Sequence, residues 1–301
     1  MATSSAGPGF ALQGSPGPSG PRPIGESAVP INSINTNISA QIALSFLNAT
    51  NRDMDQVQQR VSTGLKVNGA VDDASSFAIA QGLRGDIKAY GAVSQGIANG
   101  RGVATIALSV ATSISDLIAD VKKKIIEGMN AANTSEQQNI LNADFQSLSA
   151  QINTFISNAV YNGRNILSSF STSVNVIANI DGTVMTIRSQ SSFSTSSTNL
   201  GAQNISSTVA SFRALSALEI AESAIAIALG QIGADVRALN FQSDFISQLT
   251  DSTTEGLGDI VDADMAKESA RLQALQVKQQ LGVQTLNIAN QRPTILQQLF
   301  R

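Results

Sequence analysis

The sequence predicts a mainly α-helical protein, an elongated antiparallel coiled-coil or helical-bundle rod with a small β-hairpin region in the middle of the chain. First, apolar residues recur three and four positions apart through most of the 301 residues, which is helical spacing. Second, the chain is 42% hydrophobic but only 4% aromatic and 14% charged, a mix that suits long helices packed through small side chains. Third, one short segment alternates apolar and polar residues, as a strand does.

The composition excludes several kinds of site. The chain has no His and no Cys, which removes most zinc, iron–sulfur and haem sites and every Ser-His-Asp or Cys-His arrangement. Carboxylate or lysine chemistry remains formally possible, but no constellation of residues supports it. We therefore expect a non-enzyme with no catalytic residue, no cofactor and no bound metal.

Charge and hydropathy limit the partners. A net charge of -3 provides no basic field for nucleic acid, and the Lys122–Lys124 run is expected to be a solvated helix face. Asp259, Asp262 and Asp264 lack the spacing of a calcium loop and indicate helix N-terminal capping instead. No window approaches about 18 uninterrupted apolar residues, and the N-terminus lacks a signal-peptide pattern. Neither membrane insertion nor cleaved general secretion is expected.

The first part of the chain changes character at Ile31. Residues 1–30 are rich in Gly, Pro and Ser and predict a disordered extension. The next segment predicts a helix that ends near Gly64, a residue suited to a C-terminal cap. This helix has two apolar faces, one formed by Ile34, Ile38 and Ile42 and the other by Ala43, Leu47, Met54, Val57 and Val61.

Two further helices follow. Asp72 or Asp73 is suited to cap a long helix whose apolar pattern continues through Ile125. A third helix begins after the Asn133–Ser135 break and ends at the turn signal Tyr161–Gly163.

Residues 168–208 are the only β-like part of the chain. Val174, Val176 and Ala178 alternate with polar residues, Asp181–Gly182 supplies a hairpin turn, and Val184–Ile187 forms the returning strand. We expect a hairpin at about 173–190, and we expect the flanking Ser- and Thr-rich runs to be surface loops.

The helical pattern resumes from Val209. Apolar positions from Leu215 to Ile246 step three and four residues without an error, over more than four heptads. This repeat predicts an antiparallel coiled-coil or bundle helix, with a break over Thr250–Gly258.

The C-terminal segment, Leu257–Arg301, has two opposite apolar stripes. One stripe consists of Val261, Met265, Leu272, Leu275 and Leu286, and the other of Ala263, Ala266, Ala270, Ala274, Val277, Leu281 and Ile288. A helix of a monomer needs only one buried face, so the second stripe requires a second partner. We expect residues 31–70 and 257–301 to pair as one domain, and residues 71–256 to form the rod.

Several short motifs resemble those of bacterial flagellins. They read INTN from Ile34, RVSTGLKVN from Arg60, DDA from Asp72, YNG from Tyr161 and ANQRP from Ala289. The resemblance runs from about residue 31 to the end of the chain and is weakest over 168–208. The positions that carry it are Asn35, Asn37, Arg60, Gly64, Asp72, Asp73, Asn162, Gly163, Asn290, Gln291 and Arg301.

The resemblance implies a structural subunit of the flagellar filament, exported unfolded and self-assembling into a helical tube that acts as the motility propeller. It implies a short form without large outer domains, secreted and extracellular. In the family, the terminal helices form the inner core of the filament. The implied partners are further copies of the chain, other flagellins, the type III export apparatus, an export chaperone on the C-terminal helix, the filament cap and hook-associated proteins.

Such a role gives the excess apolar stripes a purpose as contact surfaces between copies. Without that partner, the terminal helices are expected to be poorly ordered in the monomer. The expected polymerisation interface comprises Ile34, Ile38, Ile42, Leu47, Met54, Val57, Val61, Val261, Met265, Leu272, Leu275, Val277, Leu281, Leu286 and Ile288.

Two departures from the family pattern and two alternatives remain. Residues 1–30 are additional to the usual start of the family, and Ile125 and Ile126 occupy positions where some flagellins carry an Arg-Glu pair recognised by an innate Toll-like receptor. Weak receptor activation is therefore expected. The alternatives are a hook–filament junction protein of the same family and a coiled-coil extracellular adhesin or tip protein. A flagellin-like metalloprotease would need an HExxH helix, which a chain without His cannot form.

Overall fold

A computed structural model describes the backbone of residues 36–299 and the side chains of residues 36–291. The expected disordered extension 1–30, together with Ile34, Asn35 and Arg301, lies outside the described residues. The chain divides into two compact units. Unit 1 contains the described residues 36–62 and 265–299, and unit 2 contains residues 63–264.

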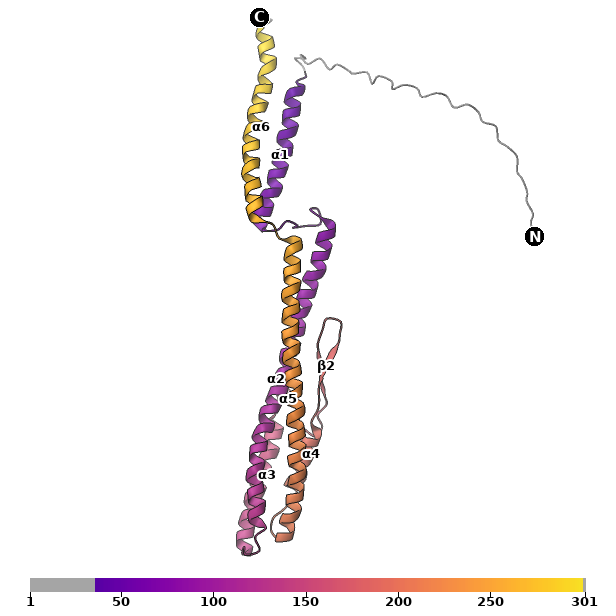
Figure 1. Cartoon of the computed structure of the whole chain (residues 1–301), viewed down its shortest axis with the longest axis vertical. Coiled ribbons are helices and arrows are strands. Elements are labelled where there is room, and N and C mark those ends of the chain that lie inside the picture. Colours follow the sequence, from indigo (N-terminus) through magenta and orange to yellow (C-terminus); the bar gives the residue numbers. More distant parts are fainter. Residues whose placement is uncertain (1–35, 300–301) are drawn as a thin grey trace, which may run out of the picture. The chain divides into compact units, whose positions relative to one another are not determined.

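Unit 1 consists of two long helices that lie side by side, α1 (Ile38–Thr63) and α6 (Met265–Leu299) (Figure 1). The Asn37 side chain accepts a hydrogen bond from the Ala40 amide at 3.0 Å and thereby caps the first turn of α1. Gly64 follows the last residue of α1 with a φ of 72°, the left-handed conformation that ends helices and favours glycine. The expected end of the first helix is confirmed.

Unit 2 is built on two helices of more than fifty residues each, α2 (Ala74–Gly128) and α5 (Thr208–Val261). The helix α3 (Ser135–Asn158) packs on α2, and α4 (Ser191–Gly201) packs on α3 and α5 (Figure 1). Cross-helix contacts pair Arg101 with Asn240 and Lys122 with Glu222, so the residue number rises along α2 as it falls along α5. The two helices are therefore antiparallel, and the predicted mainly helical bundle with one small hairpin is confirmed.

Short polar motifs fix where the helices of unit 2 begin. The Asp73 carboxylate accepts hydrogen bonds from the amides of Ser75 and Ser76, which makes it the N-cap of α2. Thr134 and Gln137 form a reciprocal capping box at the start of α3. Both starts lie where the sequence predicts them.

The heptad repeat predicted for α5 is the buried seam of unit 2. Residues spaced by seven positions are buried there, namely Leu218, Ile225, Ile232, Leu239 and Ile246. A companion row that the sequence analysis did not single out consists of Ala214, Ala221 and Ala228, all at most 1% exposed. These alanines lack bulk, so the α2 and α5 backbones approach closely along the seam.

The hairpin pairs β1 (Val174–Ile177) with β2 (Val184–Ile187) in the predicted antiparallel arrangement, with Val174 opposite Ile187. Gly182 takes a φ of 79° in the connecting turn. Two α5 residues hold the hairpin. Asp235 accepts from the Arg188 amide and guanidinium, and Gln242 donates to the Ala178 carbonyl at 2.7 Å.

The sequence analysis predicted that the Ser- and Thr-rich run after the hairpin is a surface loop. The structure shows that this run forms the helix α4 instead. Phe193, Ser197 and Leu200 fall on one helical face and are buried. The expectation was wrong because it weighed the hydroxyl content of the run above this spacing. Thr195 and Thr198 instead donate to the carbonyls four residues earlier, which satisfies their hydroxyls within the helix.

The predicted break over Thr250–Gly258 is also wrong, because α5 continues without interruption to Val261. The hydroxyls of Thr250 and Thr253 donate to carbonyls of the preceding turn, so they are satisfied within the helix. Beyond them, Val261 is buried in a cluster with Val67 and Ala80, and its carbonyl accepts from the Lys66 amide at 2.7 Å. Packing against the connector after α1 outweighs the weak local preference of this segment.

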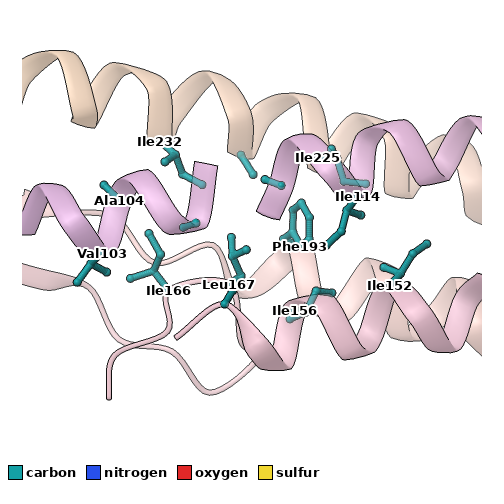
Figure 2. Packing of buried hydrophobic residues seen from close by; sticks show 14 of the residues in the cluster. Val103, Ala104, Ile114, Ile152, Ile156, Ile166, Leu167, Phe193, Ile225 and Ile232 are labelled. Atoms are coloured by element: carbon teal, nitrogen blue, oxygen red, sulfur yellow. The ribbon is translucent and has the colours of Figure 1, made fainter. Parts of the chain in front are cut away.

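A continuous apolar core joins the four helices and the hairpin of unit 2. Figure 2 shows Phe193 of α4 beside Ile114 of α2, with Ile156 of α3 and Leu167 nearby. Both α2 and α5 are long and apolar enough to cross a membrane by length and composition alone. The core helices of a bundle satisfy the same criterion, so the absence of membrane insertion remains a prediction.

Truncation of a fully buried aromatic residue tests this core. Phe193 is 0% exposed, so Phe193→Ala is expected to lower the free energy of unfolding of unit 2 by about 3–5 kcal/mol in urea unfolding followed by circular dichroism. Phe170→Ala removes a ring that is 94% exposed and is the matched control, with an expected change within about 0.5 kcal/mol. Equal losses in the two variants would contradict the described core.

The N-cap of α2 predicts a pH dependence. The Ser76 hydroxyl, followed by the Ser76 and Ser75 amides, holds the pKa of Asp73 below its ordinary value of 3.8. Because the folded pKa is the lower one, this contribution is fully present above about pH 3.8 and is lost as the pH falls through the folded pKa. The stability difference between the native chain and Asp73→Ala should therefore shrink as the pH falls below this value.

The neutral variant Asp73→Asn is the control for this titration. It keeps a hydrogen-bond acceptor but no ionisable group, so its stability relative to Asp73→Ala should not change with pH. Urea unfolding of each variant over the acidic range measures both differences. A native-chain difference that stays constant over that range would argue against the cap.

Candidate assembly surface

The inner faces of α1 and α6 meet in one heptad seam, which we term the α1/α6 seam. On α1 the covered residues step three and four positions, as Ala43, Leu47, Thr50, Met54, Val57 and Val61. On α6 they are Glu268, Leu272, Leu275, Gln279, Gly282, Leu286 and Ala289. This spacing is the pattern of a two-stranded antiparallel coiled coil.

Three polar contacts set the register of this seam. The Asn37 amide donates to the Ala289 carbonyl at 2.7 Å, and the Gln279 amide donates to Asn51 Oδ1 at 2.8 Å. At the other end, Arg60 Nη1 lies 3.4 Å from Glu268 Oε1. The partners rise along α1 as they fall along α6, so one antiparallel register satisfies all three.

The Arg60–Glu268 pair is largely enclosed in the seam. The two side chains are 21% and 10% exposed, and Glu268 Oε2 and Arg60 Nε have no hydrogen-bond partner. An unpaired charge in this position would be costly, because little water reaches it. The motif position Arg60 therefore has a physical role, which is to oppose a carboxylate inside the seam. The sequence analysis did not identify Glu268.

The outer faces of α1 and α6 leave bulky apolar side chains uncovered. Of the residues expected in the polymerisation interface, five are exposed, namely Ile42, Met265, Val277, Leu281 and Ile288. Leu281 is 55% and Ile288 64% exposed. Leu44, Phe46 and Val283 are also exposed, and the sequence analysis missed them. The outer faces thus form the apolar surface of unit 1 that a further chain can cover.

The remaining expected interface residues lie elsewhere. Seven face the α1/α6 seam, where they are buried or half-buried: Leu47, Met54, Val57, Val61, Leu272, Leu275 and Leu286. Ile38 is half-buried, and Val261 is the last residue of α5 in unit 2. The sequence pattern showed two apolar faces on each helix but could not say which face the chain covers itself.

The other motif positions organise turns. The Asp72 carboxylate accepts from the amides of Asn68 and Gly69, which closes the turn before α2. Asn162 and Gly163 both have positive φ, 48° and 74°, in a turn that joins Tyr161 and Arg164 by two hydrogen bonds of 2.9 Å. The side chains of Asn290 and Gln291 are exposed on α6.

The charged runs differ from their expected roles. Lys122 pairs with Glu222 at 3.0 Å and Lys124 with Asp144 at 3.2 Å, so two of the three lysines join helices rather than only facing solvent. The hydrogen bond to Asp144 raises the pKa of Lys124. Asp262 is the C-terminal capping residue of α5, not an N-terminal one. Ile125 is fully buried, and Ile126 is exposed.

Long helices packed around a small-residue core, with apolar side chains left exposed in unit 1, are typical of a helical structural protein, and comparisons with known proteins identify its family. Residues 34–172 match the bacterial flagellin N-terminal helical region, and residues 215–300 match the bacterial flagellin C-terminal helical region. Flagellin FljM of Caulobacter vibrioides is 36% identical over 274 residues, which are 90% of this chain and 99% of that protein. A flagellin of Brucella melitensis is 36% identical over 284 residues, or 89% and 99% of the two chains.

A solved structure from Vibrio parahaemolyticus, described as a flagellar hook-associated protein, shares the fold with a TM-score of 0.52. It is 13% identical and aligns with 64% of this chain and 100% of its own, so it shows the fold alone. The sequence matches show more: the chain belongs to the bacterial flagellin family. It is a short flagellin, a structural subunit of the extracellular flagellar filament.

Proposed function

We propose that the chain polymerises through the outer faces of α1 and α6. The observation that carries this proposal is the split between the covered α1/α6 seam and the exposed row Val277, Leu281 and Ile288 on α6. Burial of such a row contributes about 25 cal/mol for each Å² of apolar surface. A contact of several hundred Å² then contributes on the order of 10 kcal/mol, which is comparable to the free energy lost when two copies give up their independent translation and rotation.

In this proposal, unit 1 forms the inner core of the filament and unit 2 forms the surrounding layer. The proposed contact between copies joins different parts of the outer faces and is therefore heterologous. Such contacts continue into an open helix unless the rotation closes a ring. In this proposal the α1 and α6 helices gain their full order only when a neighbouring copy covers the outer faces.

The same surface would explain the further partners. An apolar face exposed before assembly gives an export chaperone a place to bind on α6, until the type III export apparatus takes the unfolded chain. Cap and hook-associated proteins would meet the same faces at the filament ends. The flagellin family is a structural one, and we propose that this chain has no catalytic activity.

One pair of substitutions tests which face forms the contact between copies. Leu281→Asp places a charge on the outer face and is expected to leave the helix content of the monomer unchanged. It should raise the protein concentration needed for assembly at least about tenfold, which corresponds to a loss of about 1.4 kcal/mol in the free energy of assembly. Leu286→Asp places the charge at the half-buried α1/α6 seam and should also reduce helix content, because pairing within the chain is lost.

Negative-stain microscopy and sedimentation after salt-induced assembly measure the first effect, and circular dichroism measures the second. Gln280→Asp, an exposed neighbour that adds the same charge off the apolar row, is the matched control and should assemble normally. Normal filaments from Leu281→Asp would exclude the outer face of α6 as the contact surface.

A further inference from the structure

A stretch of α2 in unit 2 carries glycines that the chain itself does not need. A Cβ added at Gly91 or Gly96 would meet no atom within 4 Å. By contrast, a Cβ at Gly102 would lie 2.5 Å from the Tyr161 ring, and one at Gly100 would collide with Val176. A glycine inside a helix costs about 1 kcal/mol relative to alanine. Packing within the chain therefore accounts for Gly100 and Gly102 but not for Gly96.

Gly96 lies in the floor of a groove of about 370 Å³. The part of α2 that lines the groove includes Ala92 and Gly96, and we term it the floor. The Tyr161–Arg164 turn and Val174–Ile177 of β1 line the remaining walls. The lining is mostly apolar, and small residues on α2 give the groove its depth. Arg164 is exposed at its rim.

Bulky apolar side chains are exposed on α5 at the same level of unit 2. Phe241 and Phe245 of α5 are 72% and 51% exposed. The contact between Arg101 and Asn240 places this part of α5 beside the part of α2 that lines the groove. Neither phenylalanine lines the groove, so the rings and the groove are separate surfaces of unit 2.

We propose that Phe241 and Phe245 of one copy dock in this groove of a neighbouring copy. Ring side chains fit a groove that is deep because its floor is glycine and alanine, and their burial removes apolar surface from water on both chains. Asp244, exposed beside the two rings, has the charge that complements Arg164 at the rim. Within residues 36–291, neither Asp244 nor Arg164 forms a salt bridge.

This contact is heterologous, because the rings and the groove are different surfaces of the same unit. Side-by-side copies can then repeat the contact, which gives a helical polymer unless the rotation closes a ring. The inference rests on the proposed self-assembly and deepens it. It adds a second contact, between the unit 2 parts of neighbouring copies, to the one through unit 1.

Filling the groove is the first test. Gly96→Leu places a side chain in open space on the groove floor, so the monomer should unfold at the same or a higher temperature. Assembly should nevertheless weaken about tenfold or more, measured as the concentration of unpolymerised protein at equilibrium. Gly91→Leu makes the same exchange on the same helix at a residue that does not itself line the groove, and is the matched control. Equal assembly of the two variants would overturn the docking.

Crosslinking between copies is the second test. The chain has no cysteine, so Asn99→Cys at the groove and Gln248→Cys, one turn beyond Phe245, introduce unique thiols. A short bis-maleimide should join the two variants into dimers in mixed filaments, and not in the mixed monomers. Filaments without this product would overturn the docking and leave self-assembly standing, whereas a native chain that forms no filaments would overturn both.

Discussion

The close approach of long antiparallel helices through small side chains is the constraint on which the rest of the molecule depends. Alanines spaced seven residues apart on α5 bring its backbone near α2, and the larger seam residues fill the space that remains. A seam of this kind is narrow and covers only one side of each helix. Apolar residues on the opposite side then stay exposed unless another element covers them. In unit 2, α3, α4 and the hairpin cover part of α2 and α5. In unit 1 no such layer is present among the described residues, and the outer faces of α1 and α6 remain open.

Much of this fold follows from the sequence, because heptad spacing and turn chemistry act locally. The repeat from Leu215 to Ile246, the Asp73 cap and the hairpin turn at Gly182 all lie where their residue types predict. The failures concern competition between local preference and packing. Thr-rich segments became helical in α4 and at the end of α5 because buried neighbours outweigh their weak helix propensity. Periodicity carries no information about such neighbours.

The candidate site was predictable only in part, for a related reason. A helix pattern identifies faces, and it does not identify the partner of each face. The sequence placed Leu281 and Leu286 on opposite stripes without showing which stripe faces α1, and the structure leaves Leu281 exposed and Leu286 half-buried against α1. Glu268 gave no signal of its own, since a single acidic residue among many on a helix is usually solvated. Its role as the partner of Arg60 is visible only in the structure. The groove beside the hairpin depends on three segments distant in sequence and could not be read from any one of them.

The polar contacts of the α1/α6 seam have a consequence for the order in which the two units of the chain fold. They join residues 252, 228 and 208 positions apart in the sequence. Contacts of such separation close late, after more local structure has formed. Unit 2 contains the more local contacts and does not need either end of the chain. A chain whose synthesis stops before α6 retains a folded unit 2 but has no partner for α1. We therefore expect that only a full-length chain can form unit 1. Only an intact polypeptide presents the paired surface, so truncated products are kept from entering the polymer and ending its growth.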